Sequence, residues 1–194
     1  MENRQVLLDI QGLKTYFPIK AGVFKHTVGY VRAVDGLDLK VYKGETLGLV
    51  GESGCGKTSL CKTVVMLYPA YAGRVTYCAR DCMLKLPSSD KTVVSQARRK
   101  MQYVFQDPQS SLNPAFTVFG AMNDALKLHG VKRKAERKRI VGDLLEAVNM
   151  RREQMDLYPN EFSGGQRQRI GIARALHGPG VDHLRRSGKR AGRL

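Results

Sequence analysis

Residues 51–58 (GESGCGKT) constrain the fold of this chain more than any other segment, because they fit the pattern G-x-x-x-x-G-K-[ST]. Such a loop turns successive backbone N–H groups inward around a phosphate, while its lysine neutralises phosphate oxygens and its hydroxyl binds Mg²⁺. The flanking residues favour this interpretation over a glycine-rich turn with a chance lysine. Residues 46–50 (TLGLV) predict a buried strand, and residues 58–67 predict a helix that stops before Pro69. A strand, a glycine loop and a helix N-terminus together predict an anion site.

The remaining segments alternate between strand and helix patterns, which predicts an α/β organisation. Leu37, Leu39 and Val41 alternate with polar residues, as in a half-buried strand. The other predicted segments are an opening strand with its turn at 6–17, a loop at 18–30, short strands at 73–77 and 101–105, a helix within 87–100, and mostly helical structure over 118–150 with a break near Gly130.

The chain has 194 residues and a formal net charge of +16 at pH 7, which raises the question of a nucleic-acid partner. One basic block, residues 127–139, precedes an apolar-periodic stretch and is interpreted as the solvated start of an amphipathic helix. The sequence carries no RNA-recognition motif, zinc finger or basic strand interleaved with aromatic residues. We therefore expect no nucleic-acid partner.

Three features of the sequence indicate the cellular compartment of the protein. No stretch approaches the roughly 18 consecutive apolar residues of a membrane-spanning helix. The N-terminus lacks the apolar region of a signal peptide. The four cysteines are interpreted as free reduced thiols. A cytoplasmic protein is expected.

A second motif, FSGGQ at residues 162–166, opens the run RQRIGIARAL. Ser163 and Gln166 have the spacing of a capping box, so this segment predicts a helix start. Two glycines at that start leave N–H groups free to approach a second phosphate. The alternative is simply a well-capped helix with solvent-facing arginines.

These motifs occur in the order found in the ATP-binding subunits of ABC transporters, which the chain resembles over about residues 6–176. GESGCGKT resembles the Walker A loop, Gln106 in VFQDP the Q-loop glutamine, and FSGGQ the family signature. QDPQSSLNP (106–114) and YPNEFSGGQRQRIGIARAL (158–176) are similar to the oligopeptide and dipeptide importers, with nickel importers as close relatives. The resemblance implies a P-loop NTPase (RecA-like) core with an N-terminal antiparallel β subdomain. An α-helical signature subdomain is expected as an insert at about 107–165.

The resemblance also implies ATP and Mg²⁺ as cofactors. Thr58 and Gln106 would contact Mg²⁺ or the attacking water, which makes Gln106 the expected catalytic residue. Tyr16 would stack on adenine, with Phe17 as the alternative and ordinary packing at a strand end left open for Tyr16. The γ-phosphate held by a partner subunit would touch the signature segment, namely Ser163, Gly164, Gly165 and Gln166. The phosphates of this subunit's own nucleotide would lie against Gly51, Glu52, Ser53, Gly54, Cys55, Gly56, Lys57, Thr58 and Ser59.

Several partners follow from the same resemblance. A second ATP-binding subunit, identical or paralogous, would dimerise head to tail with this one. Transmembrane permease subunits would face residues near 106–125, and a periplasmic or extracellular peptide-binding protein would act indirectly. The expected location is the inner face of the cell membrane, as a peripheral protein. A soluble ABC ATPase acting on nucleic acid or ribosomes and a non-catalytic nucleotide-binding remnant are the alternatives.

The sequence departs from the family after Leu176. Family members continue into an apolar strand ending in Asp-Glu (Walker B) and then a switch histidine. Here the last eighteen residues, HGPGVDHLRRSGKRAGRL, are basic and glycine-rich. We expect a truncation or frameshift, so that residues 1–176 form a partial nucleotide-binding domain lacking the C-terminal part of its core. Residues 177–194 are then expected to be disordered and ATP hydrolysis to be impaired.

Overall fold

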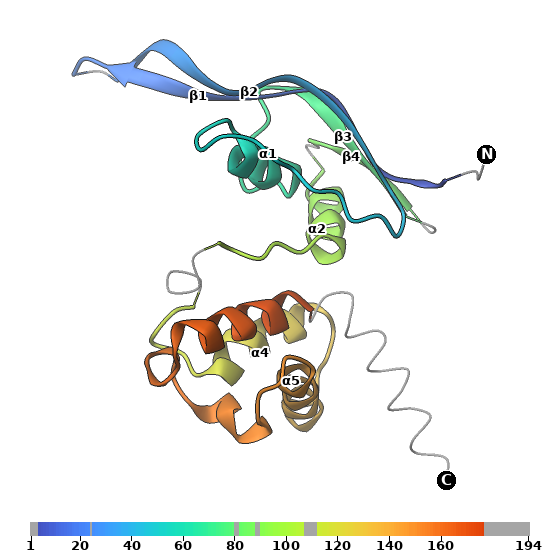
Figure 1. The fold of residues 1–194 in the computed structure, drawn as a ribbon, viewed down its shortest axis with the longest axis vertical. Helices are drawn as coiled ribbons and strands as arrows, with labels where there is room; N and C mark the ends of the chain where they lie inside the picture. The colour runs from blue at the N-terminus through green and yellow to red at the C-terminus, as the bar shows by residue number, and fades with distance from the viewer. Residues whose placement is uncertain (1–3, 24, 80–81, 88–89, 107–111, 177–194) are drawn as a thin grey trace. The chain divides into compact units, whose positions relative to one another are not determined.

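The computed structural model describes residues 4–23, 25–79, 82–87, 90–106 and 112–176. The expectation for residues 177–194, and much of the segment QDPQSSLNP, lie outside the described residues. The chain divides into two compact units, Met1–Arg98 and Arg99–Leu194. The first is an antiparallel sheet with two helices, and the second is helical (Figure 1), so the expected α/β class is confirmed.

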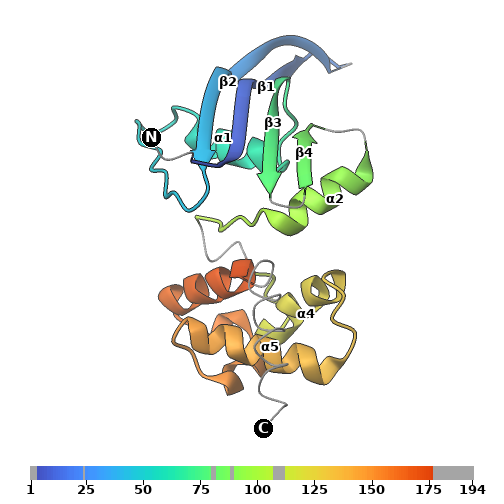
Figure 2. The same cartoon turned by 90° about the vertical axis from the view of Figure 1, so that its right-hand side faces the viewer.

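The first unit is built on a four-stranded sheet with the order β2-β1-β3-β4. Its strands are β1 (Val6–Ala21), β2 (His26–Tyr42), β3 (Ala72–Ala79) and β4 (Cys82–Leu86), and every pairing is antiparallel. Leu37 and Leu39 pair with Leu13 and Ile10 on β1, as the alternating pattern predicted. Both helices of this unit lie on one face of the sheet (Figures 1 and 2), and each buries an apolar residue, Leu60 on α1 and Ala97 on α2.

The predicted loop at 18–30 is wrong, because β1 and β2 continue through most of it as a long hairpin. The turn is confined to residues 22–25, where the Lys25 N–H donates to the Gly22 carbonyl at 3.0 Å and Gly22 has a φ of +78°. Pro18 is tolerated within β1 because β3 pairs with β1 only as far as Lys14. Beyond that point one edge of β1 is free, and an edge strand accommodates a residue that has no N–H.

Two helices pack against the sheet of the first unit. Helix α1 (Lys57–Val64) is shorter than the predicted 58–67, since Met66 adopts a φ of +59° and the Leu67 N–H closes the end on the Lys62 carbonyl at 2.8 Å. Helix α2 (Lys91–Lys100) follows Asp90, whose carboxylate accepts from the N–H and the hydroxyl of Thr92, each at 2.7 Å. The apolar core comprises Ile10, Leu13, Leu60, Val75, Leu84, Leu86 and Ala97.

Neither of the predicted strands at 46–50 and 101–105 forms. Both segments lack regular secondary structure, and among the described residues no strand pairs with either of them. Leu47 and Leu49 are exposed, and Val50 is 94% exposed. Apolar runs of this length become strands only where a neighbouring edge accepts their hydrogen bonds, so composition alone gave the wrong prediction.

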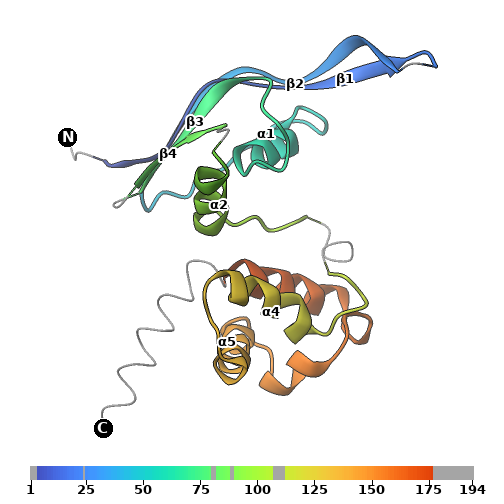
Figure 3. The ribbon, with the colours of Figure 1, turned by 180° about the vertical axis from the view of Figure 1, so that it is seen from behind.

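The second unit packs several helical segments around one apolar core (Figure 3). Helices α4 (Val118–Leu128) and α5 (Lys134–Ala147) are separated by a turn in which Gly130 has a φ of +80°, as predicted. Thr117 caps α4 by accepting from the Gly120 N–H at 3.1 Å. Two 3₁₀ turns, η1 (Arg152–Asp156) and η2 (Pro159–Glu161), lead to a last helix at 164–176. The core comprises Leu112, Val118, Met122, Leu126, Val131, Ile140, Val141, Leu144, Leu145, Met150, Met155, Phe162, Ile170 and Ala173.

Most side chains of the basic block at the start of α5 are exposed, but one is structural. Arg137 is buried and donates to Asn123 Oδ1 at 2.7 Å and to the carbonyls of Val131 and Lys132 at 2.8 and 2.5 Å. Its guanidinium therefore satisfies the backbone of the turn that joins α4 to α5.

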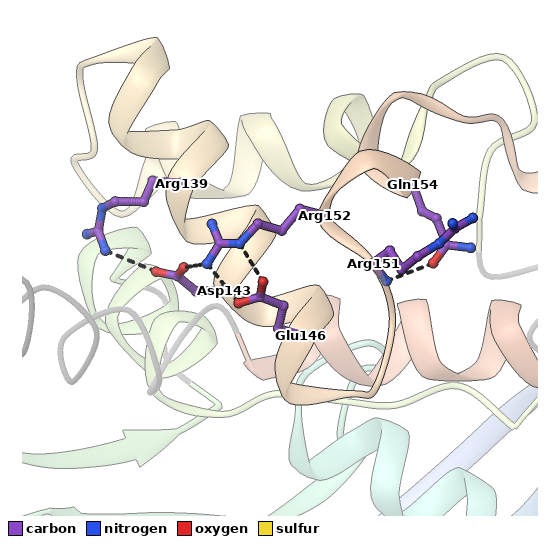
Figure 4. A network of polar contacts seen from close by, with 6 residues as sticks. All are labelled: Arg139, Asp143, Glu146, Arg151, Arg152 and Gln154. Carbon is purple, nitrogen blue, oxygen red and sulfur yellow. Dashed lines mark hydrogen bonds and ion pairs between the residues drawn. The ribbon is translucent and has the colours of Figure 1, made fainter.

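An ion-pair network fastens η1 to α5 (Figure 4). Arg152 donates to Glu146 Oε1 at 2.6 Å and to Asp143, which also accepts from Arg139 at 3.0 Å. The Arg152 side chain covers Gly142, where an added Cβ would lie 2.7 Å from Nη1. The bond from Arg152 lowers the pKa of Glu146 below its ordinary value of 4.5.

Replacing Arg152 by alanine is expected to return the pKa of Glu146 to its ordinary value of 4.5, measured by an NMR pH titration of the carboxyl carbon. Because the folded pKa is the lower one, the pair stabilises the unit above pH 4.5 and stops doing so as the pH falls through the folded pKa. Arg151→Ala is the matched control, since Arg151 donates to Gln154 Oε1 through its backbone N–H, which alanine retains. An unchanged Glu146 pKa in Arg152→Ala would contradict this assignment.

None of the helices within the described ranges has the length and apolar character required to cross a membrane.

Candidate functional site

The glycine loop at 51–56 lies between the irregular segment 46–50 and helix α1, with Gly56 as the N-cap residue. Gly54 and Gly56 have φ values of +84° and +94°, which L side chains rarely adopt. A Cβ on Gly56 would lie only 2.1 Å from the carbonyl oxygen of Ala33 on β2. The loop is therefore packed against β2 by a contact that only glycine permits.

The Lys57 side chain folds back over its own loop. Its Nζ donates to the carbonyl oxygens of Gly51 and Glu52 at 2.7 and 2.5 Å, and lies 3.3 Å from Cys55 Sγ. These exposed contacts surround the Lys57 ammonium with two backbone carbonyls and a thiol sulfur. The charge is thus not cancelled by these partners and is available to an anion.

A pocket of about 360 Å³ opens beside the loop. It brings together part of the predicted phosphate site with three residues of β2 that sequence reasoning missed. Gly51, Glu52 and Ser53 do not line it. A sequence prediction that continued the strands of the hairpin through residues 18–30 could have pointed to these β2 residues. The prediction of a loop at 18–30 hid them. The lining residues are Val31, Arg32, Ala33, Gly54, Cys55, Gly56, Lys57, Thr58 and Ser59.

Tyr16 does not line this pocket but lies in an adjacent aromatic cluster. Its ring stacks on Tyr71 with centroids 4.3 Å apart, and its hydroxyl donates to Asp35 Oδ1 at 2.5 Å. Phe17, the alternative candidate, packs edge-on against Tyr68 at 5.1 Å. Successive residues of a strand point to opposite faces, so the side chains of Tyr16 and Phe17 lie in different surroundings. Tyr16 pairs with Arg32 and Phe17 with Val31, both of which line the pocket, and the Arg32 guanidinium carbon lies 5.6 Å from the centroid of the Tyr16 ring.

Asp35 is the electrostatic centre of this cluster. The hydroxyl of Tyr16 is the main cause of a lowered Asp35 pKa, and the ion pair with Lys14, at 3.3 Å, acts in the same direction. Reciprocally, the bond to Asp35 raises the pKa of Tyr16 and of Lys14. Around neutral pH the cluster therefore holds an ionised carboxylate, a neutral phenol and a charged ammonium.

The candidates in the second unit occupy two separate segments. Gln106 is exposed, at a bend that follows the irregular segment 101–105. The capping box at the signature segment is confirmed: the Ser163 N–H donates to Gln166 Oε1 at 2.9 Å, and the Gln166 N–H donates to Ser163 Oγ at 3.4 Å. A Cβ on Gly164 or Gly165 would meet no atom within 4 Å, so this helix start is open on its outer side.

The fold and the glycine loop define a P-loop NTPase. A family model described as ABC transporter matches residues 34–179, so the chain belongs to the ABC transporter family.

Curated relatives and solved structures agree with this assignment. The chain is 42% identical over 174 residues to the oligopeptide transport ATP-binding protein AppF of Bacillus subtilis (strain 168), covering 90% of this chain and 52% of that protein. It is 41% identical over 179 residues to the oligopeptide transport ATP-binding protein OppF of Escherichia coli (strain K12), with coverages of 90% and 52%. The dimeric structure of MJ0796, a bacterial ABC transporter cassette, matches with a TM-score of 0.73 at 25% identity over 89% of this chain and 70% of that one. The chain thus spans about half the length of these curated relatives.

Proposed function

We propose that this chain is the nucleotide-binding part of an ATP-driven importer of oligopeptides. The observation that carries the proposal is the loop geometry: the Lys57 ammonium bonds to two backbone carbonyls of its own loop, beside a pocket whose wall includes Gly54–Ser59. The names of the relatives, oligopeptide transport ATP-binding proteins, favour peptide over nickel as the cargo.

The loop residues fit a nucleotide phosphate. Gly54 and Gly56 permit the left-handed backbone of the loop, and the backbone N–H groups at the start of α1 are suited to bind an anion. A phosphate would compete with the Gly51 and Glu52 carbonyls for the Lys57 ammonium. The described residues contain no group of three His, Cys, Asp or Glu side chains suited to a metal. We propose that Thr58 supplies a hydroxyl to a Mg²⁺ ion that is otherwise bound by the nucleotide phosphates.

The open helix start at Ser163 is suited to contact a nucleotide that is bound by a second subunit. We propose that Ser163, Gly164 and Gly165 contact the γ-phosphate bound by a partner subunit, as a head-to-tail dimer requires. The MJ0796 cassette, whose fold this chain shares, is dimeric, which supports this arrangement. Permease subunits at the cytoplasmic face of the membrane and an external peptide-binding protein complete the proposed system.

Lys57→Ala is the test of nucleotide binding. ATP binding to the 194-residue chain, followed by calorimetry or displacement of a fluorescent nucleotide, is expected to weaken by roughly tenfold or more, because a charge-assisted contact is lost. Lys62→Ala is the matched control in the same helix, since Lys62 contacts Tyr68 and not the loop. Equal ATP affinity in wild type and Lys57→Ala would overturn the proposal.

Turnover is the second readout of the same preparation. The sequence of residues 177–194 carries no apolar run ending in Asp-Glu, so we propose that this chain binds ATP but hydrolyses it slowly. The wild-type chain could instead hydrolyse ATP as fast as intact ABC transporters do, with the activity lost in Lys57→Ala. That result would contradict slow hydrolysis but would support nucleotide binding.

A further inference from the structure

Arg32 lies on β2 at the point where the loop pocket meets the aromatic cluster. Its side chain lines the pocket together with Lys57 and the Gly54–Ser59 backbone. Its guanidinium carbon also lies 5.6 Å from the centroid of the Tyr16 ring, which is its partner across the β1–β2 register. Arg32 is thus a pocket residue that also contacts the proposed adenine-stacking ring.

The charge of Arg32 is only partly compensated. Its Nη1 lies 3.6 Å from Asp35 Oδ2, but the same carboxylate pairs with Lys14 and accepts from Tyr16. One negative charge therefore faces two positive charges in this cluster. The Arg32 side chain is 68% exposed, so the ion pair is weak and can be exchanged for a better acceptor.

The location of Arg32 determines which part of a bound nucleotide its side chain can contact. With the base on Tyr16 and the terminal phosphates in the loop, the ribose and the α-phosphate occupy the interval between them. A guanidinium presents paired N–H donors that match phosphate oxygens. Resting on the proposed function, we propose that Arg32 is a nucleotide-binding residue whose guanidinium contacts the α-phosphate, with Asp35 orienting that guanidinium before the nucleotide binds.

The test compares ligands that share or lack the α-phosphate. Affinities of ATP, ADP, AMP and adenosine are measured by displacement of a fluorescent nucleotide from wild type, Arg32→Ala and Arg32→Lys. Arg32→Ala is expected to weaken the three nucleotides by a similar factor, roughly tenfold, and to leave adenosine unchanged. Arg32→Lys should restore part of the loss, since it keeps the charge without the fork. Arg74→Ala, an arginine on β3 that bonds to Gln11, is the charge-matched control.

The outcomes separate this inference from the function on which it rests. Unchanged nucleotide affinities in Arg32→Ala overturn the α-phosphate contact, provided that Lys57→Ala still weakens ATP. An equal loss for adenosine also overturns it, since Arg32 would then act through the Tyr16 ring. Absence of any nucleotide binding by the wild type would instead refute the proposed function itself.

Discussion

Gly56→Ala is expected to remove detectable ATP binding from the chain. The substitution imposes a side chain on a residue with a φ of +94°, which costs about 1–2 kcal/mol by itself. It also places a Cβ 2.1 Å from the Ala33 carbonyl oxygen, a separation that real Cβ atoms essentially never show. The obstacle is backbone, so the loop and β2 must separate, and the proposed phosphate site loses its geometry. Equilibrium binding of ATP is the measurement.

Gly44→Ala is the control that separates the effect of the Gly56–Ala33 contact on ATP binding from the effect of backbone strain. Gly44 has a φ of +76° but no atom within 4 Å of an added Cβ. Its variant should carry the conformational cost and still bind ATP with nearly wild-type affinity. If Gly56→Ala bound ATP as tightly as Gly44→Ala, the contact with Ala33 would not determine the conformation of the loop.

Leu145→Ala is expected to destabilise the helical unit by about 2–5 kcal/mol, the usual cost of a large cavity in a packed core. Leu145 has 0% exposure and lies on α5 among the apolar residues of the unit's core. Peptide-resolved hydrogen exchange of the whole chain is the measurement, because it reports on α4 and α5 separately from the sheet.

Leu128→Ala provides the matched comparison, since the same atoms are removed from a side chain that is 70% exposed. Its effect on exchange in α4 and α5 should be small, within about 0.5 kcal/mol. Comparable deprotection in the two variants would mean that Leu145 is not part of a tightly packed core.

Local signals predicted the helical unit well because its determinants are close in sequence. Gly130 breaks the helical pattern where the left-handed φ is found, and Ser163 and Gln166 form their capping box without help from distant residues. The period of the apolar residues between 118 and 150 is likewise a property of the segment itself.

The sheet unit was harder to predict, because strands depend on partners that can be far away in sequence. Pro18 and the glycines of 18–30 suggested a loop, yet cross-strand pairing extends the hairpin through them. Residues 46–50 carry a strand composition without a paired edge in the described residues. The pocket residues Val31, Arg32 and Ala33 were missed because a tertiary contact, the close approach of Gly56 to Ala33, places this part of β2 beside the loop.

One buried contact shows that the glycine loop cannot be transplanted as an eight-residue cassette. Thr15 on β1 and Thr63 on α1 share a hydroxyl hydrogen bond of 2.9 Å, and Thr63 also donates to the Ser59 carbonyl at 2.8 Å. Together with the Gly56–Ala33 contact, it fixes the helix after the loop to the two strands that precede the loop in the sequence, β1 and β2. A graft of this loop into another protein would have to carry the β1–β2 hairpin with it.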